Sequence, residues 1–122
     1  MNSKGNGVIA ILGSVAGDRG RKNNYIYGSA KAMLERYIEG AQHKFFQSKP
    51  FFLIIKLGPT NTKMFRNSRS SYASPASPNS VGYGILCAIR QKKSCAYVPV
   101  KWGLIMFIIS NIPRWLFNSL EI

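Results

Sequence analysis

Two largely apolar runs, each followed by a glycine, are the clearest pattern along the chain. The first covers Val8 to Leu12 and leads into Gly13-Ser14, and the second covers residues 51–57 and leads into Gly58-Pro59. Continuous rather than alternating hydrophobicity is typical of strands that are buried on both faces, as in parallel sheets. We therefore predict parallel strands near residues 8–13 and 51–57.

A long amphipathic helix is predicted between these two strands, from about residue 25 to residue 46. Its broad apolar face consists of Ala30, Ala32, Met33, Leu34, Tyr37, Ile38 and Ala41. Glu35 and Glu39 lie one turn apart and are assigned to the exposed face. A strand–helix–strand order favours a parallel crossover connection, which places the chain in the α/β class.

The second half of the chain predicts a loop, a helix and a short strand. Residues 66–80 are small, polar and interrupted by prolines, and we predict a flexible loop on the substrate side. Ser77 followed by Pro78 is a helix-start signal, and it predicts a helix through about residue 91. The predicted inward face of that helix is Val81, Ile85, Leu86 and Ile89. Residues 97–100 predict a last strand, and Pro99 favours an edge position for it.

Residues 101–120 are the most apolar segment and predict two helices broken at Pro113. The unbroken apolar part, Trp102 to Ile109, is too short to span a bilayer, which needs about 20 residues. Two interpretations stay open: the segment covers the core, or it anchors the protein at a membrane interface. Flanking tryptophans and nearby basic residues suit the second interpretation.

Charge and composition narrow the classes of partner and site. The formal net charge is +13, which favours polyanions, but the basic residues are scattered, so nucleic acid is an unexpected partner. One histidine and two cysteines cannot supply a convincing metal site. Cys87 and Cys95, without an export signal, fit a reducing compartment, so we expect a cytoplasmic protein that is peripheral on the membrane.

Ser14, Tyr27 and Lys31 have spacings that suit proton transfer to a carbonyl group. Tyr27 and Lys31 are four residues apart on one helix and therefore share a face. At ~4 Å and an effective dielectric of ~20, an ammonium attracts a phenolate by on the order of 4 kcal/mol. One pKa unit is about 1.4 kcal/mol, so this attraction would bring the Tyr27 pKa towards neutral pH. Ser14, at the end of the first strand, would hydrogen-bond the substrate oxygen.

Three segments in this order resemble one known family. They are I-L-G-S-V-A-G, Y-G-S-A-K-A and K-L-G-P-T-N-T-K-M. The stretch from Gly7 to Met64 resembles the short-chain dehydrogenase/reductase family, specifically the second half of its Rossmann-type domain. The segments resemble, respectively, the strand with the catalytic serine, the Tyr-x-x-x-Lys motif and the loop that touches the nicotinamide.

The resemblance implies a role for each residue of a candidate site. Ser14 would orient and polarise the substrate carbonyl, and Tyr27 would be the acid–base. Lys31 would lower the Tyr27 pKa and hold the nicotinamide ribose. The cofactor, NADP or NAD, would be contacted by Tyr27, Lys31, Gly58, Pro59, Thr60 and Thr62. The tail from residue 97 to residue 117 loosely resembles membrane-associated members, some of which reduce lipophilic substrates.

Residues 1–122 are expected to be the C-terminal part of a single Rossmann-type domain. The cofactor-binding half, with its glycine-rich pyrophosphate turn, has no counterpart in the sequence. We therefore predict an open edge on the first strand, weak cofactor binding and impaired activity. Expected partners are a small or lipophilic carbonyl or alcohol substrate, the membrane, and a second copy or an N-terminal half. The alternative is a non-catalytic remnant that binds membranes or proteins through residues 101–120.

Overall fold

The computed structural model of the protein describes residues 7–48, 50–66 and 74–122. Its elements alternate between strands and helices along most of the chain. In order they are β1 (Val8–Ser14), the 3-10 turn η1 (Val15–Gly17), α1 (Tyr25–Lys44), β2 (Phe51–Leu57), α2 (Lys63–Arg66), α3 (Pro78–Arg90), β3 (Cys95–Val98), α4 (Lys101–Asn111) and α5 (Arg114–Phe117).

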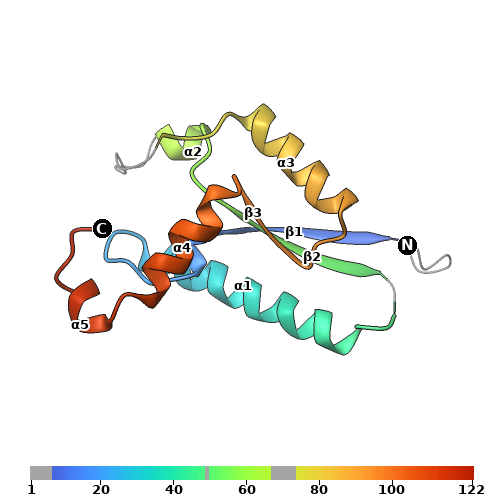
Figure 1. Ribbon diagram of the computed structural model, residues 1–122, viewed down its shortest axis with the longest axis horizontal. Coiled ribbons are helices and arrows are strands. Elements are labelled where there is room, and N and C mark those ends of the chain that lie inside the picture. The colour runs from blue at the N-terminus through green and yellow to red at the C-terminus, as the bar shows by residue number, and fades with distance from the viewer. Residues whose placement is uncertain (1–6, 49, 67–73) are drawn as a thin grey trace.

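The three strands form one parallel sheet in the order β1-β2-β3. Helices α1 and α3 lie on opposite sides of this sheet, so the molecule has three layers (Figure 1). The predicted α/β class is confirmed, and the arrangement is consistent with part of a Rossmann-like fold. Among the described residues β1 pairs only with β2, so its outer edge is open, as the sequence predicts.

The last strand lies two residues earlier than predicted. β3 ends at Val98, whereas the sequence predicted a strand over residues 97–100. Pro99 has no N–H for a ladder hydrogen bond, so the strand stops before it. Pro99 and Val100 instead accept hydrogen bonds from the first turn of α4, through the backbone N–H groups of Trp102 and Gly103. The predicted edge position of this strand is confirmed.

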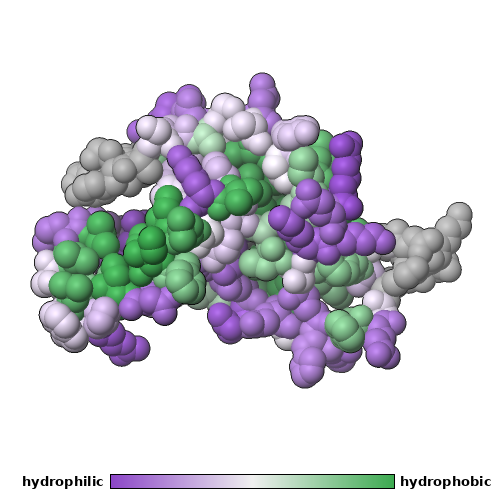
Figure 2. Space-filling model, in the orientation of Figure 1, coloured by the Kyte–Doolittle hydropathy of each residue, from purple (hydrophilic) through white to green (hydrophobic). Residues whose placement is uncertain are grey.

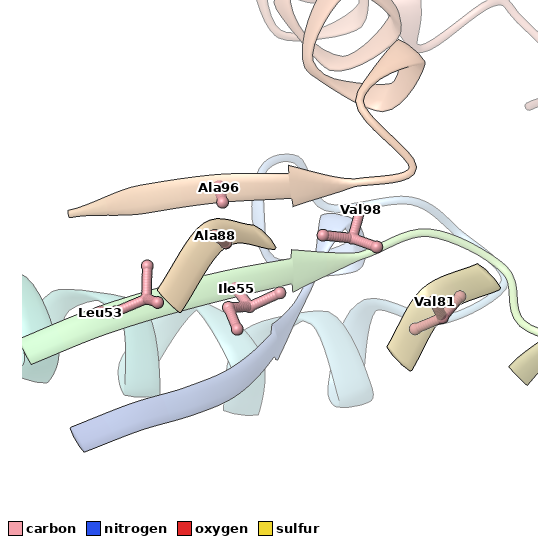
Figure 3. Close-up of a cluster of buried hydrophobic side chains, with 6 residues drawn as sticks. All are labelled: Leu53, Ile55, Val81, Ala88, Ala96 and Val98. Atoms are coloured by element: carbon pink, nitrogen blue, oxygen red, sulfur yellow. The ribbon is translucent and has the colours of Figure 1, made fainter. Parts of the chain in front are cut away.

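The main core lies between the sheet and α3. Its buried members are Leu53, Ile55, Val81, Ala88, Ala96 and Val98 (Figure 3). Alternate residues of a strand face opposite sides, so Ile55 and its neighbours at positions 53 and 57 face α3, whereas Lys56 faces α1. The prediction for Leu86 was wrong: this side chain is 51% exposed, and the small Ala88 takes the buried position instead.

Helix α1 ends at Lys44, with Phe45 at its C-cap, close to the predicted residue 46. Its predicted apolar face is only partly buried. Ile38 is buried, but Met33 and Tyr37 are both more than 70% exposed. Gly28 lets α1 pack closely against the turn η1, because a Cβ at this position would lie 2.6 Å from the carbonyl oxygen of Ala16.

The connection between α2 and α3 is shorter than the loop predicted over residues 66–80, because helices occupy both ends of that range. Arg66 ends α2, and Pro78 begins α3 with a side-chain cap from Ser77, as predicted. Ala76 forms an isolated parallel bridge with Thr60. Residues 67–73, which carry most of the predicted flexible loop, lie outside the described residues.

The C-terminal segment forms the two helices that the sequence predicts, broken at Pro113. Arg19, in the loop after β1, holds this break in place. Its guanidinium donates to the carbonyl oxygens of Ile109 at 2.8 Å and Ile112 at 2.5 Å, and it lies 4.0 Å from the ring centroid of Phe117. Within the described part of the chain, no helix combines the length and the hydropathy that a membrane crossing requires.

Candidate active site

A cavity of about 810 Å³ lies at the C-terminal ends of β1 and β2. This is where ligand crevices occur in open α/β sheets, and the volume is in the usual range for small-molecule sites. All seven predicted site residues line it. They are Ser14, Tyr27, Lys31, Gly58, Pro59, Thr60 and Thr62. Their catalytic and binding roles stay predictions, but the structure brings them to one place.

Ser14 ends β1 and also caps the turn that follows it. Its Oγ accepts a hydrogen bond from the backbone N–H of Ala16 at 3.1 Å. This bond uses an oxygen lone pair and leaves the hydroxyl proton without an acceptor among the described residues. The hydroxyl can therefore donate to the oxygen of a bound molecule.

Tyr27 and Lys31 come from the first two turns of α1, on the face towards the end of β1. Lys31 Nζ lies 5.6 Å from the centroid of the Tyr27 ring and donates a long hydrogen bond of 3.4 Å to the carbonyl oxygen of Leu12. The Tyr27 side chain is 39% exposed. The i, i+4 spacing thus gives the predicted pair, a phenol beside an ammonium at the wall of the cavity.

The loop after β2 supplies the opposite wall. Thr60 Oγ1 donates to the carbonyl oxygen of Gly58 at 3.1 Å, and Thr62 Oγ1 accepts from the first turn of α2. Gly58 is the position where a side chain would not fit, because a Cβ there would lie 2.4 Å from Trp102 Nε1. This glycine lets the start of α4 pack directly against the loop.

Several residues of the cavity wall were not predicted from the sequence. Polar members come from the loop before α1, apolar members come from α2, and the last residue of the chain closes one side. They are Arg21, Asn23, Asn24, Met64, Phe65 and Ile122. Asn24 Oδ1 is buried and has no donor among the described residues. Asn24 precedes the predicted helix, and this N-cap position could have identified it as a site residue. No sequence pattern predicts that Ile122 lies at this cavity.

A buried charge cluster that was not predicted from the sequence lies between α1, β2 and β3. Lys56 Nζ lies 2.8 Å from Asp18 Oδ1 and 2.6 Å from Glu35 Oε1. The Tyr97 hydroxyl donates to Asp18 Oδ2 at 2.5 Å. The Lys56 side chain is only 8% exposed. Assigning Glu35 to the exposed face was therefore wrong, whereas Glu39 is exposed as predicted.

The charge cluster shifts the pKa values of its members. Burial lowers the Lys56 pKa, but hydrogen bonds and attraction to Asp18 and Glu35 outweigh it, so the pKa lies above its usual value. Burial, together with the hydrogen bond to Asp18, raises the pKa of Tyr97 to about 12. Both groups are therefore protonated at neutral pH, and the single ammonium, which lies between the two carboxylates, offsets one unit of their negative charge.

The cluster connects the three segments that carry Ser14, Lys31 and Gly58. Asp18 directly follows the turn that Ser14 caps, Glu35 is one turn beyond Lys31, and Lys56 is two residues before Gly58. Short stretches of backbone therefore separate the cluster from Ser14, Lys31 and Gly58 in the cavity wall. Among the described residues, no group of three or more histidine, cysteine or acidic side chains could hold a metal ion.

Comparison with known proteins gives remote relatives. The chain is 25% identical over its whole length to a Streptomyces coelicolor protein named an uncharacterized oxidoreductase. Two proteins from Mycobacterium tuberculosis strains, also named uncharacterized oxidoreductases, are 30% and 29% identical over 98% of the chain. The chain spans about half the length of these curated relatives, 48% in each case. No protein-family model and no solved structure matches it.

Proposed function

We propose that this chain carries the catalytic half of an NAD(P)-dependent oxidoreductase of the short-chain dehydrogenase/reductase type. The observation that carries the proposal is the shared cavity of Ser14, Tyr27 and Lys31 with the loop after β2. The names of the three relatives support oxidoreductase chemistry in general. The resemblance of Gly7 to Met64 supports the finer assignment to this type of enzyme.

The residues of the cavity fit the nicotinamide end of such a cofactor. Hydroxyl and ammonium donors from Ser14 and Lys31 suit ribose and carboxamide oxygens. Asn24 Oδ1 is an acceptor without a donor, which suits a ligand that brings an N–H or O–H group. Thr60 and Thr62, with the loop backbone between them, would contact the nicotinamide and its phosphate.

The proposed chemistry is reduction of a carbonyl group or the reverse reaction. NADPH or NADH, when bound, supplies the hydride that adds to the carbonyl carbon and is itself oxidised. The Tyr27 hydroxyl donates its proton to the substrate oxygen, which converts C=O to CH–OH. Lys31 stabilises the phenolate that remains, and Ser14 hydrogen-bonds the substrate oxygen as negative charge develops there.

The substrate is proposed to carry an apolar substituent beside the carbonyl group. The cavity combines the polar groups above with the apolar side chains of Leu12, Val15, Leu57, Met64 and Phe65. Such a lining favours an apolar molecule that is oriented by few hydrogen bonds.

The test compares Tyr27 with Tyr25, which lies two positions earlier on the same helix. A chimera joins residues 1–122 behind the N-terminal half of a Mycobacterium tuberculosis relative, and NADPH oxidation with a panel of apolar ketones is measured. Tyr27→Phe should lower kcat by about 10²-fold or more, the usual contribution of a general acid. Tyr25→Phe, a control outside the cavity lining, should leave kcat unchanged. Equal turnover of the two variants would remove Tyr27 from the mechanism.

Binding by the 122-residue chain is a separate measurement. We expect its affinity for NADPH to be weak, because the described residues fit only one end of the cofactor. Titration followed by the fluorescence of the reduced nicotinamide checks this. Tight binding by the chain alone would contradict the expectation.

A further inference from the structure

An exposed apolar surface covers α4 and α5, and the proposed chemistry does not use it. Figure 2 shows hydrophobic residues gathered over these helices with hydrophilic residues around them. We call this surface the C-terminal apolar face and define it by five side chains: Leu104, Phe107, Ile108, Trp115 and Leu116. Four of them are more than 50% exposed, and Trp115 is 76% exposed.

The C-terminal apolar face is the outward side of a well-fixed pair of helices. Leu104, Phe107 and Ile108 have the i, i+3, i+4 spacing of one helix face, whereas Met106 on the inward side is buried. In α5 the buried residue is Phe117, which lies under the Arg19 guanidinium. Because Arg19 also binds the last carbonyl groups of α4, the two helices present their apolar side chains in one fixed geometry.

Positive charge borders this face and has no negative charge to balance it. Lys101 and Arg114, the first residues of α4 and α5, are exposed and make no ion pair with described residues. The chain has only four acidic residues, and all four are engaged by Lys22, Arg36 or Lys56. The surface charge of the molecule is therefore almost entirely basic.

We propose that the C-terminal apolar face docks on an anionic lipid bilayer. Exposed leucine, isoleucine, phenylalanine and tryptophan side chains insert at the level of the headgroups, and lysine and arginine at the border meet anionic lipids. A second copy of this chain fits poorly, because it would bring two like-charged borders and two strongly basic molecules together. A strand added at the open β1 edge would extend the sheet away from β3, on which α4 packs, and would not cover this face.

The experiment is co-sedimentation of the 122-residue chain with phosphatidylcholine vesicles, with and without phosphatidylglycerol. We expect binding to the anionic vesicles that weakens with salt. Phe107→Ser combined with Ile108→Ser should weaken it by at least about tenfold, since two large apolar side chains no longer insert. Lys101→Gln combined with Arg114→Gln should weaken it by roughly fivefold for each removed charge.

The matched control removes two equally exposed apolar side chains from another helix. Met33→Ser combined with Tyr37→Ser, on α1, should leave vesicle binding within about twofold, because these residues lie outside the proposed contact. Circular dichroism checks that every variant is folded. Trp115 gives a second measurement, because brominated lipids should quench its fluorescence, and Trp115→Phe should remove most of the quenching.

Three results would overturn the proposal. The first is absence of binding to anionic vesicles, and the second is equal loss of binding in the Phe107/Ile108 variant and in the α1 control. The third is a concentration-dependent dimer that the Phe107/Ile108 substitutions dissociate while vesicle binding stays unchanged. None of these measurements involves turnover, so the proposed oxidoreductase activity can fail independently.

Discussion

Replacing Lys56 with methionine tests the physical account of the buried charge cluster. The substitution keeps a long unbranched side chain but removes the ammonium group that lies within 2.8 Å of one carboxylate and 2.6 Å of another. Asp18 and Glu35 are only 7% and 16% exposed, so water cannot replace the lost charge. Breaking a buried ion pair by removing one partner costs about 3–5 kcal/mol.

That cost is large beside the total stability of the protein. At roughly 0.05–0.15 kcal/mol per residue, a chain of 122 residues has about 6–18 kcal/mol of unfolding free energy. The measurement is urea unfolding followed by circular dichroism. Lys101→Met, an exposed lysine without an ion pair among described residues, is the control and should change stability by less than about 0.5 kcal/mol.

Neutralising the carboxylates separates charge from packing. In a background of Asp18→Asn and Glu35→Gln, the same Lys56→Met substitution no longer leaves uncompensated charge, so its cost should fall to about 1 kcal/mol or less. If Lys56→Met costs the same in both backgrounds, the cluster is held by packing rather than by charge. If it costs less than about 1 kcal/mol in the wild-type background, the ion pairs contribute little and the reasoning is refuted.

Tyr97 in the charge cluster and Gly28 in α1 each give one further prediction. Because the Tyr97 pKa is raised to about 12, its protonated state stabilises the fold fully below pH ~10, the pKa of an unperturbed tyrosine, and that stability is lost as the pH rises from 10 to 12. Ultraviolet absorbance of tyrosinate should show one late-titrating tyrosine that disappears in Tyr97→Phe; an unchanged titration would contradict the assignment. Gly28→Ala should destabilise the protein by about 1–3 kcal/mol, because the new Cβ meets the Ala16 carbonyl, whereas Gly40→Ala on the same helix, with open space around it, should be neutral or stabilising. Thermal unfolding of the two variants compares them, and equal midpoints would mean that α1 can shift without cost.

The sequence was sufficient for the elements that depend on local pattern. The largely apolar runs of β1 and β2 and the cap at Ser77 each depend on neighbouring residues alone. Their positions also decided the site, because parallel strands place their carboxyl ends at one edge of a sheet. Ser14 and Gly58 therefore meet at one cavity, although 44 positions separate them.

Only the tertiary structure decided which polar groups are buried together. Lys56, Asp18, Glu35 and Tyr97 come from four separate elements, and strand register brings Lys56 beside Tyr97 on the face towards α1. Local periodicity assigned Glu35 to solvent, because an acidic residue on an amphipathic helix is usually exposed when it has no buried cation opposite it. A helical period shows which face is apolar, but not what covers each face.

The C-terminal segment shows the same division between local pattern and tertiary structure. The sequence determined that residues 101–117 form two apolar helices broken at Pro113. Whether those helices cover the core or present an apolar surface depends on how α4 and α5 are oriented. Arg19, 90 positions before Ile109, fixes that orientation through contacts that no local pattern encodes. The tertiary structure thus turns Met106 and Phe117 inward and leaves Leu104, Phe107, Ile108 and Trp115 outside.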